Sequence, residues 1–239
     1  MVEPKPASLV PQRRYLRAPV PVHFPTEETV PETFVHLWVR TALWSMLRLA
    51  FGDRAVVGSD QFLYWDPTDP KQCLAPDILL WFGAPTQPFP SWKVWERGAP
   101  HLAIEVISDH DARDRHWDRK LAAYQRSGVR ELVRFDPQDN ESPLRLWDRL
   151  EGDLVEREVS RQELEYSDVL GLYWFVEPSK EFGSMLRLSR DAAGSQRLLT
   201  DDEARRAAET RADSAETRAD SAENRVRELE AELARRSAR

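Results

Sequence analysis

Two acidic residues lie inside apolar runs that otherwise have the pattern of buried β-strands. Asp77 is the second residue of the run PDILLWF at residues 76–82, and Glu105 interrupts the run HLAIEVI at residues 101–107. Burying a polar group without a partner costs on the order of 2 to 7 kcal/mol, and more if it is charged, so each acid needs a partner. Carboxylate oxygens are suitable ligands for a hard divalent cation. We therefore predict a metal site at Asp77 and Glu105.

The helix predicted after Glu105 carries a lysine, Lys120, that could lie close to the two acids. The helix is predicted from about Ala112 to Ser127, and at 100° per residue one of its sides carries Trp117, Lys120, Leu121 and Tyr124. A lysine on an inward stripe needs an anion, which the two acids or an incoming phosphate can supply.

Two carboxylates and a lysine are suited to metal-assisted cleavage of a phosphodiester bond. Mg²⁺, or Mn²⁺ in its place, takes oxygen ligands and keeps several waters, one of which can attack the phosphate. The lysine can stabilise charge on the phosphate or orient that water. The predicted catalytic residues are therefore Asp77, Glu105 and Lys120, of which the first two hold the metal.

Three further residues are candidates for supporting the site. Glu32 lies in the first turn of an earlier predicted helix. There its negative charge either stabilises the helix by interacting with the helix dipole or supports the metal site. Asp60 interrupts another apolar run. Tyr124 belongs to the inward stripe, and its hydroxyl would reach the polar margin of the core.

A strip of arginines is a candidate for contacts with a DNA backbone. Its leading members are Arg113, Arg115 and Arg119, and Arg126 and Arg130 extend it. Acidic residues alternate with these arginines, namely Asp109, Asp111, Asp114 and Asp118. A solvated helix surface with internal ion pairs is therefore an equally good interpretation of the strip.

The elements that position these residues follow from periodicity and from turn residues. Apolar residues at helical spacing predict a largely buried helix over Pro31 to Phe51, and Arg54 to Trp65 has the pattern of a strand. With the strand-like run RELVRFD after the second helix, the order becomes helix, three strands, helix, strand. Shorter strand-like pieces over residues 138–192 predict β-hairpins beside the main sheet. The predicted class is α/β.

Four sequence pieces resemble a known family. APD, HLAIEVIS, KLAAY and GVRELVRFDP are similar to segments of the Uma-two family of candidate endonucleases, a branch of the PD-(D/E)XK restriction-endonuclease-like superfamily, and the resemblance covers roughly residues 31–188. It implies a restriction-endonuclease-like fold, cleavage of DNA, the motif aspartate at Asp77 and the second acid at Glu105. The superfamily pattern has lysine two residues after that acid, where this chain has Ile107. Members of this family generally carry the lysine on the next helix, here Lys120.

Bulk composition limits the compartment and the mode of DNA binding. The chain has 239 residues and a formal net charge of -7, so any nucleic-acid binding must come from a local basic patch. A single cysteine, Cys73, fits a reducing compartment. No apolar run is long enough to span a bilayer, and the first 30 residues lack the layout of a signal peptide. We expect a soluble, cytoplasmic protein.

Proline content and an internal repeat divide the chain. Residues 1–30 contain six prolines and predict an extended or disordered arm, followed by a restriction-endonuclease-like domain over residues 31–192. Over residues 200–239 the repeat ETRADSA and apolar residues spaced by four and three predict a coiled-coil tail. The tail would join copies of the chain, with dimers favoured; a solitary charged helix in solvent is the alternative.

These observations together predict a metal-dependent endonuclease that hydrolyses DNA. The alternative is a catalytically inactive scaffold or nucleic-acid-binding protein that keeps the nuclease fold and assembles through its coiled coil. The acidic net charge and the displaced lysine favour this alternative. Binding of Mg²⁺ discriminates between the two, because a scaffold has no need of a metal at Asp77 and Glu105.

Overall fold

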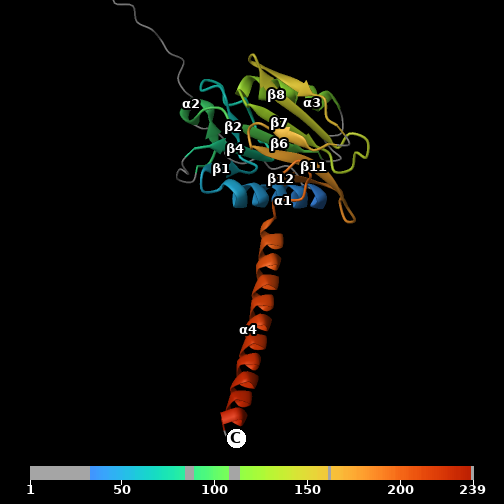
Figure 1. Cartoon of the computed structure of the whole chain (residues 1–239). Helices are drawn as coiled ribbons and strands as arrows, with labels where there is room; N and C mark the ends of the chain where they lie inside the picture. Colours follow the sequence, from blue (N-terminus) through green and yellow to red (C-terminus); the bar gives the residue numbers. More distant parts are fainter. Residues whose placement is uncertain (1–32, 84–88, 108–113, 161–162, 238–239) are drawn as a thin grey trace, which may run out of the picture.

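The computed structural model describes residues 33–83, 89–107, 114–160 and 163–237, and side chains 114–116 lie outside the description. A six-stranded mixed sheet forms the centre of the molecule (Figure 1). Its strands, in spatial order, are β1 (Ala55–Gly58), β4 (Ile78–Phe82), β6 (Leu102–Val106), β7 (Glu131–Phe135), β8 (Leu144–Leu150) and β9 (Asp153–Arg157). Helix α1 (Phe34–Phe51) packs on one face of this sheet, and α3 (Asp114–Ser127) packs on the other.

Two smaller sheets complete the structure. One contains β10 (Glu165–Ser167), β11 (Leu172–Ser179) and β12 (Gly183–Ser189) and shares the core of α1. The other contains β3 (Cys73–Leu74), β2 (Leu63–Tyr64) and β5 (Trp92–Lys93), which leads into the short helix α2 (Val94–Arg97). The last element is the long helix α4 (Asp201–Ser237).

The predicted α/β class and the order helix, three strands, helix, strand are confirmed. The order is carried by α1, β1, β4, β6, α3 and β7. Strand β4 runs antiparallel to both of its neighbours, β1 and β6. Strand β7 is parallel to β6, and α3 forms the crossover between them. Gly128 ends α3 with a φ of 81°, a left-handed conformation that glycine adopts without strain.

Two details of the predicted strands were wrong. The strand predicted over Arg54 to Trp65 ends at Gly58, because Asp60 has a φ of 56° and turns the chain into a different sheet. The β8–β9 hairpin was expected beside the main sheet, but β8 pairs with β7 and extends the sheet edge. The hairpin of β11 and β12 does pack on the main core, as predicted.

Side-chain alternation along the strands assigns residues to the two faces of the central sheet. Ile104 and Val106 on β6 belong to the core under α1. Ala103 on β6 and Leu132 on β7 belong to the core under α3. Because side chains alternate along a strand, Glu105 points toward α3.

A second buried acid, Glu131 on β7, lies on the opposite face. It is fully buried and accepts hydrogen bonds from the Ser167 hydroxyl at 2.6 Å and the Trp174 indole at 2.8 Å. Burial raises the pKa of Glu131, and the two donors only partly oppose that rise. The carboxyl therefore links the central sheet to the β10–β12 sheet.

Helix α4 begins at a capping box and then leaves the folded core (Figure 1). The Thr200 hydroxyl accepts from the Glu203 amide, and the Glu203 carboxylate accepts from the Thr200 amide. None of the described helices is long and apolar enough to cross a membrane. We keep the division into a domain at 31–192 and a tail at 200–239 as a proposal. The predicted arm at 1–30 and Glu32 lie outside the described residues.

The raised pKa of Glu131 predicts a pH-dependent contribution to stability. Because the folded pKa lies above its ordinary value of 4.5, the stability contribution is complete below pH 4.5 and is lost as the pH rises through the folded pKa. Glu131→Gln keeps the shape and carries no charge. Its amide oxygen can accept from the Trp174 indole, and its amide NH2 can donate to the Ser167 hydroxyl oxygen. We expect this variant to gain unfolding free energy relative to the native protein as the pH rises, measured by urea denaturation. The exposed change Glu158→Gln should stay within about 0.5 kcal/mol throughout, and parallel curves for Glu131→Gln and the native protein would contradict the prediction.

Candidate active site

The register between β4 and β6 brings the two predicted acids to one end of the central sheet. Ile78 pairs with Ile104 in this antiparallel ladder, so one residue further along Asp77 stands opposite Glu105. Both side chains are enclosed: Asp77 is 7% exposed and Glu105 is 2% exposed. The two carboxylates therefore share one buried region at the edge where β6 ends.

Helix α3 supplies both side-chain partners of Glu105. The Tyr124 hydroxyl donates to Oε1 at 2.5 Å, and the Lys120 ammonium donates to Oε2 at 3.0 Å. Lys120 and Tyr124 are four residues apart and so lie on the same side of the helix. The Trp117 ring contacts the Trp147 ring, with centroids 5.2 Å apart, and holds this side of α3 against the sheet.

Asp77 is held from two other elements. The backbone amide of Val106 donates to its Oδ2 at 2.7 Å, and His36 Nε2 on α1 lies 3.0 Å from its Oδ1. The Ser59 hydroxyl also binds the Asp77 carbonyl oxygen. The orientation of Asp77 is thus fixed by β6, by α1 and by the loop after β1.

His36 is a functional candidate that the sequence reasoning missed. It lies in the first turn of α1, where its amide donates to the Thr33 side chain that caps the helix. The signal was present, because His36 shares a helical stripe with the buried residues Val39 and Leu43. A histidine on such a stripe requires a polar partner inside the fold, and here the partner is Asp77.

The electrostatics of the site are set by burial. Burial raises the pKa of Glu105 to about 7 against the attraction of Lys120, and the nearby Asp77 carboxylate adds to the rise. The pKa of Tyr124 is raised well above its ordinary value, first by burial and then by the Glu105 charge. Tyr124 therefore stays protonated and remains a hydrogen-bond donor. Negative charge in this region is poorly compensated by protein groups alone.

This donor set fits a hard divalent cation. Two carboxylates supply oxygen ligands, and each carboxylate oxygen keeps a second lone pair beside the hydrogen bond it already accepts. Among the described residues, no group of three histidine, cysteine, aspartate or glutamate side chains is arranged to hold a metal. The set suits Mg²⁺, which is commonly bound by one or two carboxylates together with waters and substrate phosphates. It does not suit a structural zinc site, which needs four protein ligands.

The other predicted supporting residues lie in different places. The Asp60 carboxylate pairs with Arg40 of α1 at 2.9 Å, and its side chain is largely exposed, so it anchors the helix beside the site rather than entering it. Arg119 is exposed on α3. Arg113 and the side chain of Arg115 fall outside the described residues. The structure thus brings together Asp77, Glu105, Lys120 and Tyr124.

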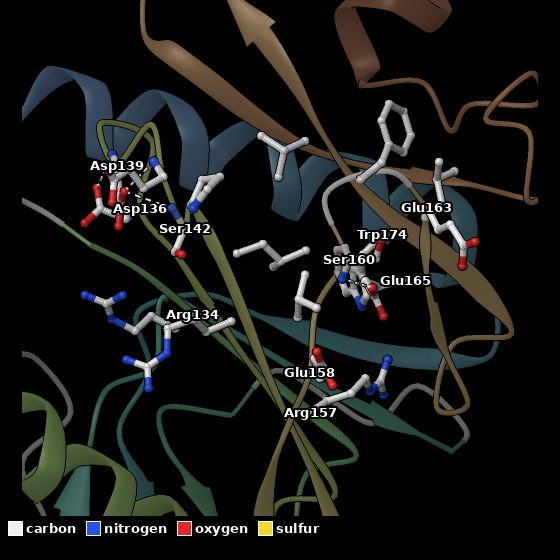
Figure 2. A pocket seen from close by; sticks show the side chains of 18 of the residues that line it. Arg134, Asp136, Asp139, Ser142, Arg157, Glu158, Ser160, Glu163, Glu165 and Trp174 are labelled. Atoms are coloured by element: carbon white, nitrogen blue, oxygen red, sulfur yellow. Dashed lines mark hydrogen bonds between the residues drawn. The ribbon is translucent and has the colours of Figure 1, made fainter.

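A separate cavity of about 1000 Å³ opens beside β8 and β9, and none of the four clustered residues lines it (Figure 2). Acidic residues exceed basic ones in its lining, and the arginines Arg134, Arg145 and Arg157 face seven acids: Asp136, Asp139, Glu141, Glu156, Glu158, Glu163 and Glu165. Several of these groups already serve the fold, since Asp136 and Asp139 accept from amides of their own loop. An acidic cavity is a poor site for a phosphate, so size alone does not identify the active site here.

Comparison with known proteins gives one family. A family described as "Putative restriction endonuclease", Uma2, matches residues 26–177. No curated protein matches the chain. A solved structure described as "a putative nuclease belonging to DUF820", from Anabaena variabilis, has 11% sequence identity and a TM-score of 0.41, and the alignment covers 65% of this chain and 76% of that chain. The match of residues 26–177 spans more than half of the 239 residues and contains the clustered side chains. The chain therefore belongs to the Uma2 family, as the resemblance in its sequence predicts.

Proposed function

We propose that this protein is a metal-dependent endonuclease that hydrolyses phosphodiester bonds in DNA. Asp77 and Glu105 hold Mg²⁺, for which Mn²⁺ can substitute, and Lys120 acts on the phosphate. The observation that carries the proposal is the convergence of two buried carboxylates and one lysine from three segments: the residue before β4, the strand β6 and the helix α3. Membership of a nuclease family supports it.

Each residue has a distinct role in this proposal. When bound, the cation supplies charge neutralisation at the phosphate and activation of a water molecule. Lys120 is one-third exposed, so its ammonium can turn from Glu105 toward an incoming phosphate and stabilise the negative charge that develops there. Tyr124 holds Oε1 of Glu105 in place, and His36 does the same for Oδ1 of Asp77. These two are positioning residues.

Contacts with DNA would come from a local surface, because the chain as a whole is acidic. Arg119 is exposed on the same helix as Lys120, and we propose it as a contact to the DNA backbone together with Arg113 and Arg115. Helix α4 is proposed to join two copies of the chain.

Replacing either carboxylate with the corresponding amide should abolish both metal binding and cleavage. We expect Mg²⁺ at about a hundred times its Kd to stabilise the native protein by about 2.7 kcal/mol, which is roughly 5 to 10 °C in Tm for a chain of this size. Asp77→Asn and Glu105→Gln should lose this shift and should not nick plasmid DNA. Differential scanning calorimetry and a gel-based nicking assay measure the two effects.

Glu131→Gln is the matched control, because it neutralises a buried glutamate on the adjacent strand, away from the site. It should keep the Mg²⁺ shift and the cleavage. A native protein that neither binds Mg²⁺ or Mn²⁺ nor cuts DNA of any form would leave the inactive scaffold as the function. Cleavage that survives Asp77→Asn would place the active site elsewhere.

Lys120 should affect turnover without being required for metal binding. Because its ammonium acts on the phosphate, Lys120→Met should lower kcat by about a hundredfold or more and keep the Mg²⁺-induced rise in Tm. The exposed change Lys71→Met is the control and should leave both unchanged. If Lys120→Met cleaved DNA at the native rate, Lys120 would only neutralise Glu105 in the folded protein.

A further inference from the structure

Helix α4 leaves the folded core with an exposed apolar seam. From residue 208 onward every described side chain is exposed, and Val226, Leu229 and Leu233 are 53%, 44% and 63% exposed. The base of the helix is fixed, because the Arg187 guanidinium on β12 binds the Glu203 carboxylate at 2.8 Å. The helix is therefore anchored at one end and unpartnered along the rest of its described length (Figure 1).

The seam follows a heptad pattern. Ala212, Ala219, Val226 and Leu233 occupy one set of positions, which correspond to a. Ala208, Ala215, Ala222 and Leu229 occupy the other set, which correspond to d. Val226 at a with Leu229 at d favours a coil of two strands. The alanines allow close approach but bury little area, so most of the apolar contact comes from the last third of the helix.

The residues that flank the seam are sorted by charge. The e positions, which follow d, are all glutamates: Glu209, Glu216, Glu223 and Glu230. Three successive g positions, which precede a, are arginines: Arg211, Arg218 and Arg225. Within the described part of the chain, Glu216 and Glu230 form no ion pair, and Arg211 and Arg218 donate to carbonyl oxygens of their own helix.

We infer that α4 binds a second copy of itself in the parallel orientation. In a parallel pair, each g residue faces the e residue of the next heptad on the partner. Arg211 then meets the partner's Glu216, and the same offset gives Arg218 with Glu223 and Arg225 with Glu230. Every one of these pairs is attractive, and the two-fold symmetry of the dimer doubles them.

The same residues would repel one another in an antiparallel pair. In that arrangement g faces g and e faces e. Arginine would then oppose arginine along one side of the coil, and glutamate would oppose glutamate along the other. The charge pattern therefore selects the orientation, which the apolar seam by itself does not.

A parallel coil places both folded domains at the same end. The inference rests on the assembly role proposed for α4 but not on DNA hydrolysis, because its readouts are mass and cross-linking. Two candidate active sites at one end of the coil could act on a single DNA molecule.

A charge reversal tests the pairing. The variant Arg211→Glu, Arg218→Glu, Arg225→Glu turns every g-to-e pair into glutamate against glutamate, so the dimer dissociation constant should rise by about a hundredfold or more. Adding Glu216→Arg, Glu223→Arg and Glu230→Arg to the same chain should restore the dimer. Sedimentation equilibrium measures the constants, and circular dichroism checks that the helix persists.

The control carries the same change of charge away from the seam. Arg206→Glu, Arg227→Glu, Arg235→Glu should leave the dimer within a few-fold of the native protein. A native chain that remains a monomer at tens of micromolar would overturn the inference. So would a charge-reversed variant that dimerises normally, or a doubly reversed variant that stays monomeric.

Cross-linking tests the orientation independently. In a Cys73→Ser background, Ala208→Cys and Leu229→Cys should each form a disulfide-linked dimer under mild oxidation, because each d residue meets its own copy in a parallel coil. Ala231→Cys, on the outer side, should not. In an antiparallel coil centred on the seam, the two copies of residue 229 would lie about 25 Å apart at 1.5 Å per residue. No single antiparallel register brings both 208 and 229 against their own copies, so cross-linking at both positions requires a parallel coil. Failure at either position rejects the parallel arrangement, which predicts both disulfides.

Discussion

The candidate active site depends on a negative charge held inside the fold. Glu105 lies on a central strand, is almost completely buried and has one cationic partner, Lys120, and one neutral donor, Tyr124. Desolvation of its carboxylate outweighs that help, since its pKa is raised to about 7. The helix that follows must dock with Lys120 and Tyr124 pointing inward, because any other rotation would leave the acid without a donor. A conflict between burial and charge at one residue thus fixes the position of a whole element.

The two buried glutamates of the central sheet show how surroundings separate structure from chemistry. Glu131 accepts from two neutral donors, Ser167 and Trp174, and joins two sheets. Glu105 instead stands opposite a second acid and beside a lysine that is one-third exposed. A neutral carboxyl satisfies the first environment, whereas the second retains excess negative charge and an accessible cation. The difference in partners is why the Glu105 side of the sheet, and not the Glu131 side, is the candidate active site.

The tail helix is stabilised by different interactions from those that stabilise the domain. Its helix rests on local sequence, a capping box at Thr200 and Glu203, and an anchor from Arg187. An isolated helix with a largely alanine seam is stabilised by helix propensity but gains little from burial. In the proposed dimer, its apolar and charged stripes pack against those of a second helix. The same chain thus combines a packed core with a long helix whose described apolar seam is exposed.

The sequence by itself determined the order of the core elements, the two strand-borne acids and the long terminal helix. These depend on periodicity, which is local. Tertiary structure alone decided that Asp77 stands opposite Glu105, that His36 reaches Asp77 from α1, and that Asp60 turns away to Arg40. It also joined β8 and β9 to the main sheet and ended β1 at Gly58. The reason is that strand register, helix docking and a left-handed residue are set by contacts between segments far apart in the chain, which no local pattern encodes.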